Sequence, residues 1–515
     1  MVHAGADAGE GGEEEVSITR RDASILLATT LVIATNGIIY ELLIAGYSSF
    51  LLGDSIYQFS LTIGLYLSAM GLGSYVTRRI KRELVRTFIV VELVIALAGG
   101  ASVLLLALAY TFTRSYELVM FSITVLVGFS IGLEIPLVTR IIAGQGSLRS
   151  AIANVLAFDY LGALVGSLAF PLWLLPQLGF LRTALAVGLL NIVVALWNLY
   201  AFRGRVRRAP LILAGSLGAC AVLAAGLVVA EAFETRTERE RFQGEVVYAQ
   251  QSLYQRIVLT QKGDHHLLTL NGHPQFSTRD EHRYHEALVH PPMALARSRA
   301  NVLILGGGDG LALREVWKYP DVDRATLVDL DPAMTDLGKY DARFTKWNVA
   351  SMADPRLVVR NEDAWKFLEA GRELFDVIIV DLPDPTNISL SKLYSVEFYT
   401  RLRARLAPGG MAAIQSGEIS PLRRRPFWCI VRTLRAAGLH VRPYSLFTQT
   451  FGVYVWSLVS HEPFDPLRAT VDVPSRYLDG ASYPALFLWD KDLAEVPVRE
   501  NRIDTHILLR YFFEA

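Results

Sequence analysis

Hydrophobic and polar positions divide this chain into two halves of different character. Up to about residue 230, apolar runs of roughly 20 residues recur, which is the length that a helix needs to cross a bilayer. They lack the polar face, repeated at helical period, that a large soluble helical core would show. We therefore predict a multi-pass α-helical membrane domain of about seven helices over residues 21–232. The seven runs are 23–45, 56–76, 88–112, 118–142, 151–174, 181–202 and 210–230.

Basic residues near the ends of these runs predict how the domain is oriented. They cluster at 78–82 and 203–208, and single arginines lie at 140 and 149. By the positive-inside rule these loops are cytoplasmic, as is the amino terminus with its arginines at 20 and 21. We therefore predict a cell-membrane protein, and seven spans would leave its second half on the opposite side.

Several polar residues lie inside the apolar runs, namely Asn36, Glu41, Glu134, Asn154 and Asp159. Ionisable groups at membrane depth are energetically expensive and usually face a cavity or a partner. Two interpretations stay open. One is a pathway for a cationic ligand through the bundle. The other is interhelical hydrogen bonding, or positions near the interface that water reaches.

The second half alternates short apolar and polar segments. Strand-like segments at 244–250, 255–261 and 265–271, the last two joined by a turn at 262–264, predict a small β domain over 244–292. Alternating strands and helices then predict an α/β Rossmann-like, doubly wound sheet over 293–515. Its strands are expected at 301–305, 325–330, 357–360, 375–380, 411–415, 441–444 and 453–459, with helices such as 311–317, 332–340 and 395–405 between them. Residues 1–20 are expected to be a disordered acidic tail, and 233–243 a charged linker.

Composition excludes some classes of function. The net charge is zero, with 50 basic and 50 acidic residues, so no global basic field favours nucleic acid as a partner. Two cysteines, Cys220 and Cys429, are too few for a disulfide framework or a cysteine metal site. The sequence shows no other cluster with metal-ligand spacing, and we expect no metal.

Candidate chemistry gathers where the predicted strands end. The first strand of the large sheet runs into Gly306-Gly307-Gly308, the kind of loop that lets a backbone approach a nucleotide closely. The dinucleotide fingerprint is incomplete, because Leu311 stands where its third glycine is expected. Ligands of open α/β sheets bind beyond the carboxyl ends of the strands, where acidic residues also follow three later strands. These are Asp329, Asp363 (followed by Ala364), and the pair Asp381 and Asp384. Together they predict an adenosine ligand without a pyrophosphate, such as S-adenosylmethionine or a derivative.

Four segments then resemble the spermidine synthases, the polyamine aminopropyltransferases: 271–293 (NGHPQFSTRDEHRYHEALVHPPM), 305–320 (LGGGDGLALREVWKYP), 326–332 (TLVDLDP) and 380–385 (VDLPDP). The similarity runs from about residue 244 to the end, and YHE, GGGDG and DxxD in this order are specific. A subgroup of the family carries an amino-terminal multi-pass membrane domain. The resemblance implies a methyltransferase-type sheet that transfers the aminopropyl group of decarboxylated S-adenosylmethionine to an amine. With putrescine, the leading acceptor, the products are spermidine and methylthioadenosine. The donor is a co-substrate, and no cofactor is permanently bound.

The resemblance also assigns roles to residues. Asp381 accepts a proton from the attacking amine and Asp384 holds that amine. A neighbouring pair of carboxylates is also expected to raise the pKa of one of them, which suits a base near neutral pH. His285 and Asp309 contact the polyamine or the aminopropyl nitrogen, and Tyr284 and Gln275 line the same cavity. The thioadenosine is held by Gln255, Gly306, Gly308, Asp329, Asp363 and Ala364.

Each residue taken alone has a structural alternative. Asp309 could cap the following helix, Asp329 could stabilise a loop, and Asp384 before Pro385 is a common turn pair. His285 could be a surface histidine on an amphipathic helix.

Two segments depart from the family pattern. The family usually follows the DP of DxxDP with a Gly-Pro segment that covers the thioadenosine, where this chain has Asn387-Ile388. Residues 447–454 (FTQTFGVY) replace aromatic and proline residues that shape the acceptor pocket. Donor binding and the base therefore look intact, and the acceptor stays open.

Two other functions stay open as alternatives. One is a methyltransferase that uses intact S-adenosylmethionine. The other is a polyamine transporter or sensor with a degenerate synthase domain. The expected partners are a polyamine and the lipid bilayer, in a homo-oligomer. Because the donor is made inside cells, the catalytic domain is expected in the cytoplasm, although seven spans argue for the other side.

Overall fold

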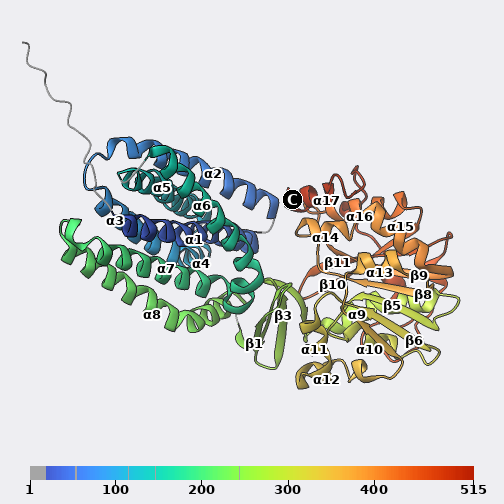
Figure 1. Ribbon diagram of the computed structural model, residues 1–515. Coiled ribbons are helices and arrows are strands. Elements are labelled where there is room, and N and C mark those ends of the chain that lie inside the picture. Colours follow the sequence, from blue (N-terminus) through green and yellow to red (C-terminus); the bar gives the residue numbers. More distant parts are fainter. Residues whose placement is uncertain (1–18, 53–54, 114, 145–146, 243, 515) are drawn as a thin grey trace, which may run out of the picture. The chain divides into compact units, whose positions relative to one another are not determined.

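The computed structural model describes residues 19–514 apart from 53–54, 114, 145–146 and 243. Most of the expected acidic tail therefore lies outside the described residues. The chain divides into two compact units, Met1–Phe242 and Gln243–Ala515, coloured blue to green and green to red in Figure 1.

The amino-terminal unit is built of helices. Each of the seven predicted apolar runs falls on one of them, or on a pair. In the part of the chain that the structure describes, five helices are long and apolar enough to cross a membrane, or six if the pair α3 and α4, bent by 41°, is one span. The helices are α1 (Arg20–Leu52), α2 (Ser55–Val76), α3 (Leu84–Gly100), α4 (Ser102–Phe112), α5 (Tyr116–Ala143), α6 (Leu148–Ala169), α7 (Leu175–Ala201) and α8 (Ala209–Phe242). Helix α8 continues through most of the segment predicted as a linker.

One of these five, the stretch Leu148–Ala201, comprises α6 and α7 and contains a break. Gly179 has a φ of 71° and a ψ of −176°, which no helix contains. The hydroxyl of Thr183 donates to the carbonyl oxygen of Leu174, nine residues earlier, at 3.3 Å. In a straight helix those residues would be about 13 Å apart along the axis, so the chain bends sharply here.

Close backbone contacts and buried amides hold the helices together. A Cβ added to Gly73 of α2 would lie 2.1 Å from the carbonyl oxygen of Phe129 of α5, so only glycine lets these helices approach so closely. The amide of Asn36 donates to that of Asn191, between α1 and α7. For Asn36 the structure thus supports interhelical hydrogen bonding. Asn154 is exposed on α6.

The carboxyl-terminal unit begins with a four-stranded antiparallel sheet in the order β1-β2-β3-β4. Its strands are β1 (Glu245–Gln251), β2 (Arg256–Lys262), β3 (His265–Leu270) and β4 (His273–Ser277). The first three match the predicted strands, and Gly263, with a φ of +62°, lies in the predicted turn. The fourth strand was not predicted.

A seven-stranded sheet follows, in the order β10-β11-β9-β8-β5-β6-β7. The five strands from β9 to β7 are parallel, β11 runs antiparallel to β9, and β10 pairs antiparallel with β11. The strands are β5 (Asn301–Gly306), β6 (Arg324–Val328), β7 (Leu357–Arg360), β8 (Phe375–Asp381), β9 (Leu406–Glu418), β10 (His440–Thr448) and β11 (Gly452–Ser460). This order makes the sheet Rossmann-like, and the direction of its crossovers reverses between β5 and β8.

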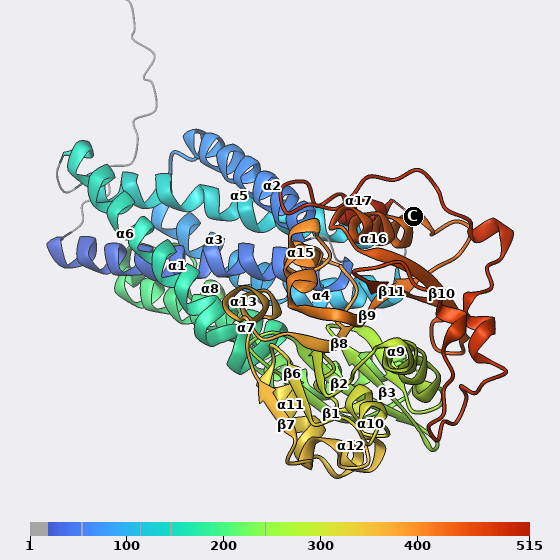
Figure 2. The ribbon, with the colours of Figure 1, turned by 90° about the vertical axis from the view of Figure 1, so that its right-hand side faces the viewer.

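Helices cover both faces of the seven-stranded sheet (Figure 2). Alternate residues of β5 and β8 enter two different hydrophobic cores, one on each face, as expected for buried parallel strands. The helices are α9 (Glu281–Leu295), α10 (Leu311–Val316), α11 (Pro332–Tyr340), α12 (Ala342–Trp347), α13 (Ala364–Ala370), α14 (Ile388–Lys392), α15 (Val396–Arg405), α16 (Arg425–Ala436) and α17 (Ile507–Phe513). Helix α9 packs on β8, β9 and β10, although the predicted boundary at residue 292 assigns it to the small β domain.

Candidate active site

The glycine turn after β5 lies at the point where the crossovers reverse, which is where open α/β sheets bind ligands. Gly306 and Gly307 have φ values of 85° and 65°, in the left-handed region that favours glycine. Gly306 lies opposite Asp381 of β8 in the parallel ladder. A Cβ on Gly307 would be 3.4 Å from Oδ2 of Asp381. The carboxyl group of Asp381 therefore faces the glycine turn.

Tyr284 of α9 fixes the other oxygen of Asp381. Its hydroxyl donates to Oδ1 of Asp381 at 2.6 Å, and its ring packs against those of Tyr454 and Trp456 on β11. Burial and the charge of Asp381 hold the pKa of Tyr284 well above its usual value, so the phenol stays a donor. Burial raises the pKa of Asp381, while the charge of His285 and the bond from Tyr284 lower it in part.

His285 is buried, with 2% of its surface exposed, so it is not a surface histidine. Its Nδ1 lies 2.9 Å from Oε2 of Glu281, one helical turn earlier. Glu281 also accepts two hydrogen bonds from the guanidinium of Arg314, at 3.0 and 2.9 Å. Because of Glu281, the pKa of His285 is raised despite its burial, and the charges of Asp309 and Asp381 contribute. The imidazole of His285 thus lies among carboxylates that favour its protonated form.

Asp309 belongs to the same cluster and also caps a helix. Its Oδ1 accepts from the backbone N–H of Leu311 at 2.9 Å, so the structural alternative holds for this residue. Burial raises its pKa to about 6; the charge of Asp381 adds to this and that of His285 opposes it. Asn348 donates to its backbone oxygen at 2.8 Å. The capping bond uses one oxygen, so the carboxyl group keeps acceptor capacity.

Asp329 follows β6 and braces the glycine turn from the other side. Its Oδ2 accepts from the backbone N–H of Gly308 at 3.0 Å, and its Oδ1 from that of Asp331 at 2.9 Å. It therefore does stabilise a loop. Gln255, ahead of β2, donates to Oδ2 of Asp331 at 2.9 Å. Gln255, Asp329 and Gly308, three residues predicted for the thioadenosine, are thus linked through Asp331. Burial raises the pKa of Asp329 to about 6.

Asp384 is held by a separate polar network. The amide of Gln415 on β9 donates to Oδ1 of Asp384 and to the hydroxyl of Tyr454, each at 2.6 Å. Tyr394 donates to Oε1 of Gln415 at 2.9 Å. Burial raises the pKa of Asp384 to about 6; the bond from Gln415 lowers it and the charge of Glu418 raises it.

One expectation about the pair Asp381 and Asp384 is wrong. Their mutual repulsion was expected to raise the pKa of one of them. Burial is the main cause for each, and the carboxylate that adds to the shift of Asp384 is Glu418. Each aspartate has its own donor, Tyr284 or Gln415, and its own charged neighbour, His285 or Glu418.

Three other predicted residues lie apart from these hydrogen-bond networks. Asp363 caps α13, accepting from the backbone N–H of Trp365 at 2.7 Å, and Ala364 is buried as the first residue of that helix. Both follow β7, at the same edge of the sheet. Gln275 lies on β4, where its amide donates to the carbonyl oxygen of His273 at 3.3 Å.

Sequence reasoning missed the residues that position the others. Glu281, Arg314, Gln415 and Asp331 hold His285, Asp384 and Gln255 in place. Spacing alone could have found Glu281, since it lies four residues before His285 on one helix. Gln415 gives no such signal, because it comes from a distant strand. Within the described residues, no group of three or more His, Cys, Asp or Glu side chains could hold a metal ion.

Comparisons with known proteins bear on this arrangement. The family model of the spermine/spermidine synthase domain matches residues 281–467. Polyamine aminopropyltransferase 2 of Ralstonia nicotianae is 41% identical over 509 residues, which cover 96% of this chain and 98% of the relative. The polyamine aminopropyltransferase of Leptospira interrogans is 36% identical over 490 residues, covering 95% and 97%. A crystal structure of spermidine synthase with the transition-state analogue AdoDATO has 26% identity and a TM-score of 0.43, covering 48% of this chain and 88% of that one. The similarity to the first two relatives extends over both units.

Proposed function

From the chain's membership of the polyamine aminopropyltransferase family, we propose that it makes spermidine and methylthioadenosine from putrescine and decarboxylated S-adenosylmethionine. The family uses this donor as a co-substrate. The acceptor, the second product and the roles of single residues are the parts proposed. The observation that carries the proposal is the carboxyl group of Asp381 facing the glycine turn while bound to Tyr284.

The reaction is a displacement at carbon. The nitrogen lone pair of a neutral amine attacks the aminopropyl carbon next to the sulfonium. A C–N bond forms, the C–S bond breaks, and its electron pair stays on sulfur in methylthioadenosine. The nitrogen must lose a proton, because both ends of putrescine are ammonium groups at pH 7. Asp381 is proposed to take it, and a pKa raised by burial suits a base near neutrality.

The other acidic groups hold cations. Asp384 is proposed to bind the incoming amine, and Asp309 the aminopropyl nitrogen of the donor. Carboxylates around a sulfonium and two ammonium groups orient them and favour their approach. Asp329 is proposed to accept from the ribose hydroxyls beside the glycine turn. Asp363 and Ala364 are proposed to meet the adenine, and Gln255 to support this side through Asp331.

The test is a transfer assay on the purified full-length protein in detergent. Decarboxylated S-adenosylmethionine is offered with a panel of diamines, and product masses are read. Spermidine from putrescine is expected, with a 10²- to 10⁴-fold loss of rate in Asp381→Asn, the range for a missing general base. Methylthioadenosine should still bind to that variant. Methylated products from intact S-adenosylmethionine would instead identify a methyltransferase.

We also propose that the amino-terminal unit lies in the cell membrane and that the carboxyl-terminal unit is cytoplasmic, where the donor is made. Large apolar side chains on the outside of its helices support the first part, for example Leu172, Trp173 and Val228, each more than 60% exposed. An even number of spans, such as six, would place both ends of the unit on the same side of the membrane. If the break at Gly179 divides Leu148–Ala201 into two spans, the number becomes seven, and the two ends lie on opposite sides. Protease digestion of oriented membrane vesicles tests the side. We expect the carboxyl-terminal unit to be digested in inside-out vesicles, whose cytoplasmic face is outward, and to be protected in vesicles of the opposite orientation.

A further inference from the structure

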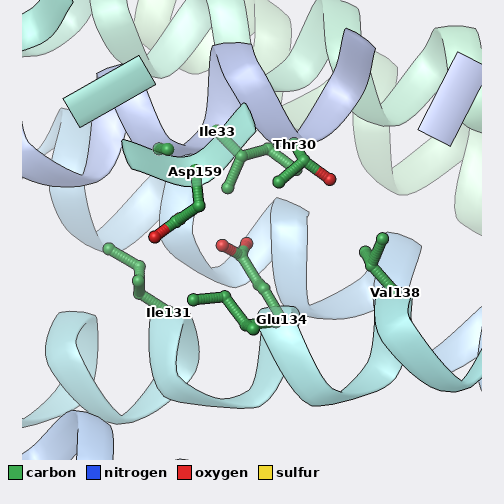
Figure 3. A pocket seen from close by; sticks show the side chains of 8 residues that line it. Thr30, Ile33, Ile131, Glu134, Val138 and Asp159 are labelled. Carbon is green, nitrogen blue, oxygen red and sulfur yellow. The ribbon is translucent and has the colours of Figure 1, made fainter. Parts of the chain in front are cut away.

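A cavity lies inside the amino-terminal unit, between α1, α5 and α6. Its wall consists of Thr30, Ile33, Ala34, Ile131, Glu134, Ile135, Val138 and Asp159. Figure 3 shows the carboxyl groups of Glu134 and Asp159 directed into the same space. The enclosed space is small, close to that of one water-sized group. Two acids and mostly alkyl side chains therefore surround it, and among these eight residues none is basic.

The acid deepest in this cavity has an oxygen without a partner. Glu134 is 3% exposed, and its Oε1 has no hydrogen-bond partner within the described structure. The charges of Glu92, on α3, and of Asp159, on α6, both act on it. Glu92 is fully buried, and its carboxyl group is hydrogen-bonded to that of Glu134. Unpaired buried carboxylates are energetically costly, so such a group calls for a bound cation or proton.

Asp159 keeps part of its surface accessible, whereas Glu134 is buried. The hydroxyl of Thr30 is already used, since it donates to the carbonyl oxygen of Leu26 at 2.9 Å. The cavity thus offers carboxylate oxygens at one spot and a hydrocarbon wall elsewhere. This is an asymmetric site with one charged end.

We propose that this cavity binds the primary ammonium group of an alkylamine between Glu134 and Asp159. An ammonium group is about the size of a water molecule, carries the required charge, and donates three hydrogen bonds. The enclosed space holds the ammonium group alone, so the alkyl chain continues outside the cavity. A hard metal ion suits the site poorly, because calcium takes six to eight oxygen ligands and this wall offers few.

This site lies in a different unit from the carboxylate cluster of the transfer reaction. It is therefore an additional amine site and does not depend on transfer taking place. Only the choice of putrescine as the probe rests on the proposed function. A diamine can place one end in the cavity and leave the other end outside.

The test uses the full-length protein in phosphatidylcholine nanodiscs. Equilibrium dialysis with [¹⁴C]putrescine measures how many molecules bind per chain, and the transfer rate is measured on the same samples. Glu134→Gln should lose one bound putrescine per chain, or bind it at least tenfold more weakly, with the transfer rate changed less than twofold. Asp159→Asn, a half-buried and milder change, should weaken the same site. Glu117→Gln is the matched control, because Glu117 is exposed in the first turn of the same helix.

The outcomes separate this proposal from the proposed function. Unchanged putrescine binding in both Glu134→Gln and Asp159→Asn overturns the cavity site, whatever the transfer assay shows. Binding of ²²Na⁺ that depends on Glu134 and is not displaced by methylammonium also overturns it, in favour of a metal ion. Binding that depends on Glu134 in a protein without transfer activity keeps the cavity site and refutes the transfer reaction. If Glu134→Gln does not fold, judged by gel filtration, Asp159→Asn alone decides.

Discussion

The hydroxyl of Tyr284 donates a 2.6 Å hydrogen bond to Oδ1 of Asp381, joining helix α9 to the end of strand β8. The two residues are 97 positions apart in the sequence. The bond leaves Oδ2 of Asp381 turned toward the glycine turn. It also favours the charged form of a carboxylate whose pKa burial raises. Tyr284 thus orients the proposed base and lowers its pKa.

Replacing Tyr284 by phenylalanine removes this donor and keeps the ring. Because the hydrogen bond lowers the pKa of Asp381, that pKa should rise further in the variant. The acidic limb of the kcat/KM profile should then move to higher pH, and kcat/KM near pH 7 should fall by about tenfold or more, as for a lost hydrogen bond to a charged group. Tyr340→Phe, on an exposed tyrosine of the same unit, should leave the profile in place. An unshifted acidic limb in Tyr284→Phe would show that Asp381 is not the titrating base.

Gly308 tests the donor side of the site. A Cβ at this position would lie 2.7 Å from Oδ2 of Asp329, closer than real contacts allow. Gly308→Ala should therefore displace Asp329, destabilise the turn by about 1–3 kcal/mol, and raise the KM for decarboxylated S-adenosylmethionine about tenfold. The KM for the amine should change little. Gly480→Ala is the control, because a Cβ there meets nothing within 4 Å. Equal effects on both KM values would argue against a donor site at this turn.

Glu281 is expected to contribute to stability as well as to position His285. Its pKa is lowered to about 2 by His285 and Arg314 despite burial, and the shift from 4.5 corresponds to about 3 kcal/mol. A lowered pKa means that this contribution is present above pH 4.5 and is lost as the pH falls toward 2. Glu281→Gln should lower the melting temperature by several degrees at pH 7, measured on the full-length protein in detergent. The difference from wild type should shrink below pH 4.5.

A control for Glu281 is available on the surface. Glu462 pairs with Arg297 at 3.6 Å, with both side chains more than 70% exposed. Exposed pairs contribute between zero and about 1 kcal/mol. Glu462→Gln should therefore leave the melting temperature nearly unchanged. If Glu281→Gln also left the melting temperature unchanged at pH 7, the buried network would not stabilise the fold.

The sequence predicted the sheet well because its strands are short, apolar runs bounded by glycine and charged residues. Strand β7 and helix α11 match their predicted limits, and the other strands differ mainly at their ends. The break at Gly179 falls in the gap predicted between the apolar runs 151–174 and 181–202. Strand β4 was missed because His273-Pro274 interrupts its apolar pattern.

For the site, the sequence could indicate which residues lie at the edge of the sheet but not how they pair. Asp329, Asp381 and Asp384 were expected there because each follows a predicted strand. That Asp384 accepts from Gln415, which also donates to Tyr454, whereas Asp381 accepts from Tyr284, depends on where β9, β11 and α9 lie in the fold. The origin of the raised pKa values was mistaken for the same reason, since burial is a property of the folded chain.

Gln415 offers the test of the acceptor side. Its amide donates to Asp384 and lowers the pKa of that carboxyl, which burial raises to about 6. In Gln415→Met the pKa of Asp384 should rise, so more of it is protonated at pH 7 and less charge holds the cationic amine. The KM for putrescine should increase about tenfold at pH 7, as for a lost hydrogen bond to a charged group, with a smaller change in kcat. The difference should diminish at higher pH, where Asp384 is ionised in both proteins. Gln261→Met, on an exposed amide of β2, is the control. A fall in kcat at constant KM, independent of pH, would mean that Asp384 does not bind the acceptor.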